Sequence, residues 1–228
     1  MNAMHPRSQM TQAWADHVDA LNVAQDPSIA NVTPQQLERW RLVQRRALFE
    51  WNAAKPASRS FLAQCGLPAR LSRELRAAGS SYLLVPQRDC MGELWALQYL
   101  PPRFRPGRAN PRAADGPRRM LNPREAGLHF WVGDVPEGDG AGATVGITEY
   151  LHDAVTFHAE TDSPCLVAFS PENLALLAQL VRAAFPAARV AIWARWEQQT
   201  EAAHAVARQG PGVRALTDLG ALDVEVQP

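Results

Sequence analysis

Large apolar side chains recur every three or four residues in the first third of the chain, which predicts a helix over residues 33–54. Thr33 can cap the first turn, Pro34 suits that turn, and Gln36 completes a capping box. The pattern predicts one buried stripe, and the arginines of this helix lie mostly off it, as on a solvated helix face. The stripe comprises Leu37, Trp40, Val43, Ala47 and Trp51.

Short helices and short strands are predicted next. Residues 55–79 read as two short helices, broken where Gly and Pro stand at positions 66–68. Residues 81–89 and 93–100 are rich in strand-forming residues and are joined by a turn at Gly92, which predicts a hairpin.

The last third alternates short apolar runs with amphipathic stretches. The run at 164–169 has no polar side, which is typical of a strand buried on both faces, and 189–193 is predicted to be buried as well. Repeated strand–helix–strand units predict a parallel sheet with right-handed crossovers, so the predicted fold class is α/β, with a helical and β-rich region before it. The predicted strands are 143–149, 164–169, 189–193 and 213–216, and the predicted helices are 150–161, 170–186 and 197–210.

Polar residues follow three of these strands. Glu149 ends the first, Ser170 follows the second, and Arg195 to Glu197 follow the third. Chemistry in parallel sheets collects at the carboxyl ends of the strands, so these positions are the first candidates for a site. We expect Glu149, Ser170 and Arg195 to lie at one edge of the sheet.

Composition narrows the classes of function. The 228 residues carry 23 basic and 23 acidic side chains, so any nucleic-acid binding needs a local patch. The three cysteines are far apart and form no CxxC pair, which fits a reducing compartment and argues against a structural zinc site. No apolar run is long enough to cross a membrane, and no secretory signal is present, so we expect a cytoplasmic protein.

The strongest local positive patch is the segment 103–124, which holds seven arginines and one acidic residue. Proline, glycine and asparagine interrupt it, which predicts a loop. Two interpretations stay open: a solvated loop, or a contact with the phosphate backbone of single-stranded nucleic acid. The candidate nucleic-acid-binding residues are Arg103, Arg105, Arg108, Arg112, Arg118 and Arg119.

Other conspicuous residues have ordinary explanations. His152 and His158 are six apart, a poor spacing for shared metal ligation on a helix. Trp193 and Trp196 could stack on bases, but core packing is the more common role of large aromatic residues. These patterns give three expected parts: a flexible N-terminal arm (1–32), a helical and β-rich region (33–140) and the parallel α/β domain (141–228).

The C-terminal part resembles the Toprim (topoisomerase–primase) domain of plasmid- and phage-type primases. The family's first motif is a strand ending in Glu-Gly before a helix, and Ile147 to Ala154 stand there in this chain. The second is an apolar strand leading to Asn-Leu, here Asn173 and Leu174; the third is a strand ending in Ala-Asp-x-Asp, here residues 190–197. Residues 82–102 and 127–133 resemble the segments that precede Toprim in these primases.

In the family, the glutamate and two aspartates support Mg²⁺-dependent phosphodiester chemistry. Glu149 matches the glutamate and Glu197 the second aspartate, whereas Tyr150 replaces the glycine and Arg195 the first aspartate. Arg195 would repel a metal ion and pair with Glu149. The resemblance therefore implies a Toprim scaffold with a degenerate metal site and no cofactor, or a site holding Mg²⁺ through Glu149 and Glu197 if catalysis remains.

Three hypotheses follow. The first is a non-catalytic nucleic-acid- or protein-binding accessory of the replication or conjugation proteins of a mobile genetic element. The second is a divergent metal-dependent primase or nicking enzyme that uses Glu149 and Glu197, with Asp218 or Asp223 as further acidic residues. The third is an assembly partner that binds no nucleic acid.

Overall fold

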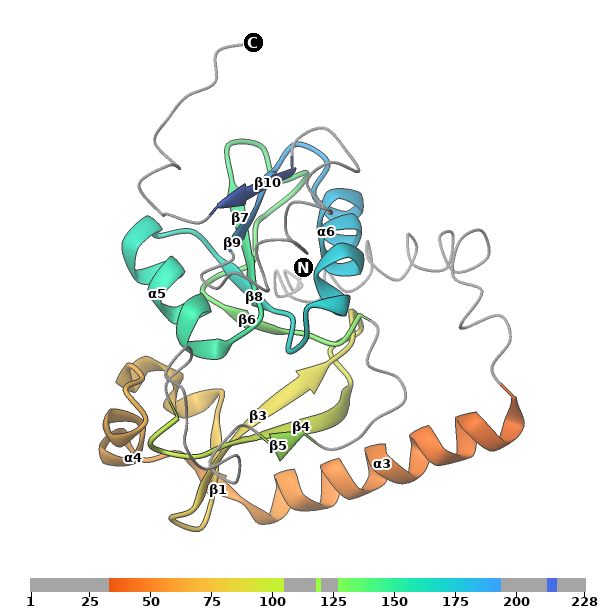
Figure 1. The fold of residues 1–228 in the computed structure, drawn as a ribbon, viewed down its shortest axis with the longest axis vertical. Helices are drawn as coiled ribbons and strands as arrows, with labels where there is room; N and C mark the ends of the chain where they lie inside the picture. The colour runs from red at the N-terminus through yellow and green to blue at the C-terminus, as the bar shows by residue number, and fades with distance from the viewer. Residues whose placement is uncertain (1–32, 105–117, 120–126, 194–212, 217–228) are drawn as a thin grey trace, which may run out of the picture. The chain divides into compact units, whose positions relative to one another are not determined.

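The computed structural model describes residues 33–104, 118–119, 127–193 and 213–216 (Figure 1). Contacts divide the chain into two compact units, with the division between Phe130 and Trp131. The expected domain limits at residues 32 and 140 stay predictions. The helix predicted over 197–210 lies outside the described residues.

The first unit begins with helix α3 (Pro34–Ala53). The capping box is formed: the backbone N–H of Gln36 donates to the Thr33 hydroxyl (3.2 Å), and that of Thr33 donates to the Gln36 side chain (2.8 Å). Burial along the predicted stripe increases toward the end of α3, where Ala47 and Trp51 are buried. They pack against Leu84, Leu97 and other residues of the sheet beside the helix.

That sheet has five short strands in the order β1-β2-β3-β4-β5. The predicted hairpin is confirmed as β3 and β4, which pair antiparallel with Leu83 opposite Leu100. Two short helices, α4 and the 3-10 helix η1, lie on either side of the predicted break at 66–68, but the ends of the segment 55–79 form strands β1 and β2, where helix was predicted. The elements are β1 (Lys55–Pro56), α4 (Arg59–Gln64), η1 (Ala69–Arg73), β2 (Arg76–Ala78), β3 (Tyr82–Arg88), β4 (Leu94–Leu100) and β5 (Arg118–Arg119).

β5 corrects one expectation. The segment 103–124 was predicted to be a loop throughout, yet Arg118 and Arg119 pair antiparallel with Tyr99 and Gln98 of β4. β5 adds two paired residues to the edge of the sheet. Pro117 and Pro123 flank β5 in the sequence, and proline cannot donate a backbone hydrogen bond to a neighbouring strand, which limits the length of β5.

The second unit is the predicted α/β part, and its fold class is confirmed. Its sheet has the order β10-β9-β7-β8-β6, and β7 pairs parallel with both β8 and β9. β10 pairs parallel with β9, so the last predicted strand is also confirmed. The elements are β6 (Phe130–Val132), β7 (Thr144–Thr148), α5 (Leu151–Thr161), β8 (Cys165–Val167), α6 (Glu172–Ala184), β9 (Arg189–Trp193) and β10 (Val213–Leu216).

Helices α5 and α6 cover opposite faces of this sheet (Figure 1). The chain passes from β7 to β8 in one direction and then returns past β7 to β9. A right-handed crossover in each direction puts the two helices on opposite faces. The strands between them are almost wholly buried, as predicted for 164–169 and 189–193, and the two threonines of β7 are buried with them.

The start of α6 differs in detail from the prediction. The predicted helix 170–186 has Ser170 before Pro171, a sequence typical of a side-chain cap, but the helix begins at Glu172, after Pro171, and has no side-chain cap. Ser170 instead accepts a backbone hydrogen bond from the N–H of Asn173 (3.3 Å). Pro171 already has helical backbone angles, which moves the capping position one residue past Ser170.

Candidate functional site

Glu149 follows β7 at the carboxyl edge of the parallel sheet. Ile147 is level with Ile192 of β9, so Thr148 is level with Trp193, the last residue of that strand. The register therefore makes Glu149 the first position beyond β7, beside the end of β9. Its side chain is half-buried.

The loop after β8 reaches the same edge. The backbone N–H of Phe169 donates to the carbonyl of Glu149 (3.1 Å), and that of Ala168 donates to the carbonyl of Thr148 (2.7 Å). Ser170 follows directly and is buried. The sequence prediction that Glu149 and Ser170 share one edge is confirmed, whereas Arg195 lies outside the described residues.

A side-chain amide fixes this loop. Phe169 has φ +66°, a left-handed conformation that is uncommon for a non-glycine residue. The buried Asn173, in the first turn of α6, donates from Nδ2 to the carbonyl of Ala168 (2.9 Å). Asn173 was noted in the sequence as part of a motif, and the structure gives it a positioning role at the loop beside Glu149.

The topology marks this edge as the place for a ligand. The strand order reverses at β7, because β8 lies on one side of it and β9 on the other. The connections that leave neighbouring strands on opposite faces open a crevice outside their carboxyl ends, and ligands of open α/β sheets bind there. Glu149 stands at this switch point.

Asp153 was overlooked as a candidate in the sequence. It lies four residues after Glu149, in the first turn of α5, and is buried. Burial is the main cause that raises the pKa of the Cys165 thiol, and the negative charge of Asp153 is a lesser cause. Asp153 therefore lies near Cys165, on the face of the sheet that α5 covers. An acidic residue in the apolar pattern of 151–157 was the signal that could have revealed it.

The described residues at this edge do not by themselves make a metal site. Mg²⁺ takes hard oxygen ligands in octahedral geometry, usually carboxylates together with water and phosphate. Within the described ranges, no group of three or more histidine, cysteine, aspartate or glutamate side chains could hold a metal ion. The hydroxyl of Thr148, the nearest further oxygen along β7, donates to the carbonyl of Tyr150 (3.1 Å). Glu197 and Arg195 lie outside the described residues.

Two further predictions concern the residues of α5 and β9. Trp193 is buried, and its ring centroid lies 6.4 Å from that of Phe157, which favours core packing over base stacking. Nδ1 of His158 lies 2.9 Å from the carbonyl oxygen of Ser163, as expected of an ordinary helix residue. Trp196 lies outside the described residues.

The structure describes only residues 103–104 and 118–119 of the arginine segment. Arg103 is exposed, just after β4. The backbone of Arg118 and Arg119 is held in β5 by pairing with β4. Arg105, Arg108 and Arg112 lie outside the described residues.

No family model matches the chain, and no curated protein matches its sequence. Solved structures that resemble it include a DnaG primase catalytic domain bound to single-stranded DNA, with 15% identity, TM-score 0.40, and coverage of 91% of this chain and 71% of that one. The RNA polymerase domain of Mycobacterium tuberculosis primase DnaG with double-stranded DNA has 17% identity, TM-score 0.36, and coverage of 96% and 75%. Another structure of this Mycobacterium tuberculosis domain has 15% identity, TM-score 0.34, and coverage of 98% of this chain and 81% of that one. No helix among the described residues is both long and apolar enough to span a membrane.

Proposed function

We propose that this protein is a nucleic-acid-binding accessory without catalysis of its own, acting beside the replication or conjugation proteins of a mobile genetic element. The observation that carries the proposal is the pairing of Arg118 and Arg119 with β4. It holds part of the richest arginine segment of the chain on a folded sheet, and that segment begins at Arg103, three residues after the end of β4.

Arginines gathered on such a segment neutralise phosphates without reading bases. The proposed ligand is therefore single-stranded nucleic acid, bound through its backbone. The Toprim-like sequence pattern supports a nucleic-acid role, and Arg195 at the first aspartate position supports the loss of catalysis. No cofactor is proposed.

The test is the salt dependence of binding to a fluorescently labelled single-stranded DNA oligonucleotide. Replacing Arg118 and Arg119 together with alanine should weaken binding, and should reduce the salt slope by about 0.7 for each phosphate that the variant no longer neutralises. The matched control is Arg70→Ala with Arg73→Ala, two exposed arginines of η1, which removes the same charge elsewhere in the same unit. Equal affinity and slope in the wild type and the Arg118/Arg119 variant would remove this pair from the proposal.

The second candidate function is a divergent primase or nicking enzyme. The position of Glu149 at the switch point favours it, because a carboxylate there could take part in metal-assisted phosphodiester chemistry. It would need Glu197 as a second ligand and Mg²⁺ as the cofactor. Calorimetric titration of the wild type and of Glu149→Ala with Mn²⁺ separates the two functions.

A further inference from the structure

Helix α3 presents large apolar side chains outward. Four large apolar side chains are exposed in the described part of the chain, and three of them belong to α3: Leu42 (61% exposed), Leu48 (41%) and Phe49 (75%). Leu42 and Phe49 are seven residues apart and so lie in one line along the helix, on the side away from buried Ala47. Surface apolar residues that gather in this way mark interaction sites.

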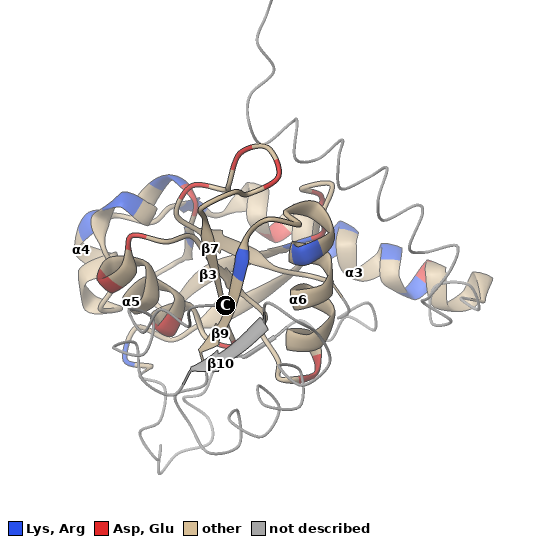
Figure 2. Ribbon diagram, turned by 90° about the horizontal axis from the view of Figure 1, so that it is seen from above, with Lys and Arg blue, Asp and Glu red and all other residues tan. Residues whose placement is uncertain are grey.

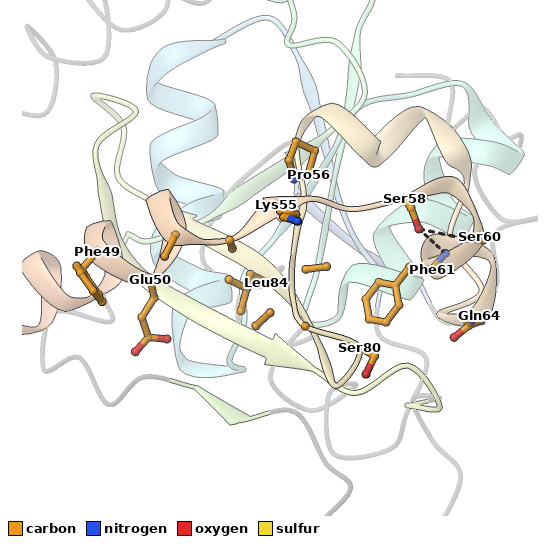
Figure 3. A pocket seen from close by; sticks show the side chains of 15 residues that line it. Phe49, Glu50, Lys55, Pro56, Ser58, Ser60, Phe61, Gln64, Ser80 and Leu84 are labelled. Atoms are coloured by element: carbon orange, nitrogen blue, oxygen red, sulfur yellow. Dashed lines mark hydrogen bonds between the residues drawn. The ribbon is translucent and has the colours of Figure 1, made fainter.

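A pocket of about 780 Å³ adjoins Phe49. It is lined by the end of α3, by β1 and α4, and by β2 with the turn after it. The side chains of Phe49 and Phe61 lie on opposite sides of this pocket (Figure 3). Its volume is in the range that holds a bulky side chain or a small ligand.

The pocket selects an apolar group. Most of its lining residues are alanine, proline, phenylalanine or leucine, and only Glu50 and Lys55 carry charge. Glu50 is already engaged, because it accepts hydrogen bonds from Nε of Arg46 (2.9 Å) and from the hydroxyl of Tyr99. A phosphate group in this pocket would meet the negative charge of Glu50 as well as the positive charge of Lys55, so the lining favours an apolar group over a phosphate.

Positive charge surrounds the exposed apolar side chains on α3. Arg39, Arg41 and Arg45 are exposed along the helix before Phe49. Figure 2 shows basic residues spaced along α3. The helix has four arginines against two glutamates, Glu38 and Glu50, and Glu50 is paired with Arg46. The outward face of α3 therefore carries more positive than negative charge, and its complement is acidic.

We infer that α3 and the adjoining pocket bind an acidic segment of a partner protein. Its acidic side chains would pair with the arginines of α3, and its large apolar side chains would cover Leu42 and Phe49 and enter the pocket. This is the groove mode of recognition, in which apolar anchors supply affinity and charge sets partner choice. A second copy of this chain fits less well, because two α3 faces would bring Arg45 and Arg46 of both copies together. The proposed binding residues belong to α3 and the pocket, and none of them belongs to the arginine segment 103–124.

Selection from a random peptide display library tests the inference, with the full chain as the target. Peptides enriched in aspartate or glutamate together with leucine or aromatic residues are expected. The selected peptides are then synthesised and their affinity for the protein is measured. Replacing Phe49 of the protein with serine should lower that affinity roughly tenfold or more, because it removes an anchor residue. Leu42→Ser should weaken binding in the same direction.

Met91→Ser is the matched control, since it removes the one other large exposed apolar side chain of the described residues and leaves α3 intact. The exposure of Phe49 makes its replacement compatible with folding, and the melting temperature checks this. Enrichment of basic peptides, no enrichment, or equal binding by the Phe49 variant would each overturn the inference. Two further outcomes would overturn it. One is that no peptide binds but Phe49→Ser weakens binding to single-stranded DNA. The other is that the protein forms a dimer that Phe49→Ser dissociates.

Discussion

Gly146 in the middle of β7 lies directly beneath the ring of Phe157 in α5. A β-carbon on Gly146 would stand 2.5 Å from Cε1 of Phe157, closer than such carbons approach any neighbour. Phe157 is fully buried and also contacts Trp193 of β9, so its ring cannot move away freely. The glycine thus sets how closely α5 packs on the sheet and, through α5, where the chain leaves Glu149.

Replacing Gly146 with alanine should therefore destabilise the protein by about 1–3 kcal/mol, the usual cost of overpacking a core. Urea unfolding measures the free energy. Phe157→Leu provides the control, because it removes the ring atoms that the new methyl group would meet. In the Phe157→Leu protein, Gly146→Ala should lower the free energy of unfolding by at least about 0.5 kcal/mol less than it does in the wild type. Additive losses would show that the ring is not the obstacle.

The turn between β3 and β4 depends on one carboxylate. Oδ1 of Asp89 accepts the backbone N–H groups of Met91 and Glu93 (both 3.0 Å), and Oδ2 accepts Nε1–H of Trp95 (2.7 Å). Asp89→Ala leaves these donors without their acceptor, so a loss of about 2–3 kcal/mol is expected in urea unfolding, with a change in tryptophan fluorescence. Glu93→Ala is the control, because the exposed Glu93 keeps its backbone bond to Asp89. Equal losses for the two variants would contradict the prediction.

The elements that the sequence predicted depend on neighbouring residues, whereas the missed strand depends on residues far away along the chain. The Thr33–Gln36 capping box, the turn at Gly92 and the buried strands of the parallel sheet depend on neighbouring residues, and all were predicted. β5 depends on pairing with β4, which lies 18 residues or more before it in the chain. A two-residue strand leaves no periodic signal, so it could not be predicted.

The candidate site shows the same difference. Glu149 could be placed at a strand end from sequence, because strand ends are visible in the apolar pattern. The burial of Asp153 depends on the packing of α5 against the sheet. The bond from Asn173 to Ala168 spans five residues but depends on the left-handed backbone at Phe169, which leaves no signal in the sequence pattern. The outward apolar line of α3 was also missed, because its inward stripe explains the helix by itself.

His129 should make stability depend on pH. It is buried, with Nδ1 2.9 Å from the carbonyl oxygen of Gly127, and burial lowers its pKa in the folded protein. The unfolded chain titrates near the ordinary value of about 6.5, so below that pH the unfolded state takes up a proton that the folded state resists. Stability is full above about pH 6.5 and falls as the pH drops toward the lowered pKa, by up to about 1.4 kcal/mol per pH unit.

His129→Asn isolates this contribution. Asparagine can donate a hydrogen bond to Gly127 but does not titrate. The variant should be less stable at neutral pH, because it leaves space in the core, yet its free energy of unfolding should fall less steeply between about pH 7 and 5. Urea titrations at several pH values measure both quantities. A variant slope equal to that of the wild type would assign the pH dependence to other groups.

Metal binding decides between the accessory and the enzyme. The proposed accessory has no tight Mn²⁺ site, because Arg195 supplies positive charge where the Toprim pattern has a carboxylate. Replacing Tyr150 with glycine and Arg195 with aspartate restores the ligand types of that pattern. Tyr150 has φ −110°, which glycine also adopts, so the change mainly removes bulk beside Glu149. The double variant should bind Mn²⁺ measurably by calorimetry, though more weakly than a site with ideal geometry, since ligand placement matters as much as charge.

Glu160→Ala is the control for losing a carboxylate, because Glu160 is exposed near the far end of α5. Tight Mn²⁺ binding by the wild type that survives Glu160→Ala and disappears with Glu149→Ala would reject the accessory and establish a metal centre at the switch point.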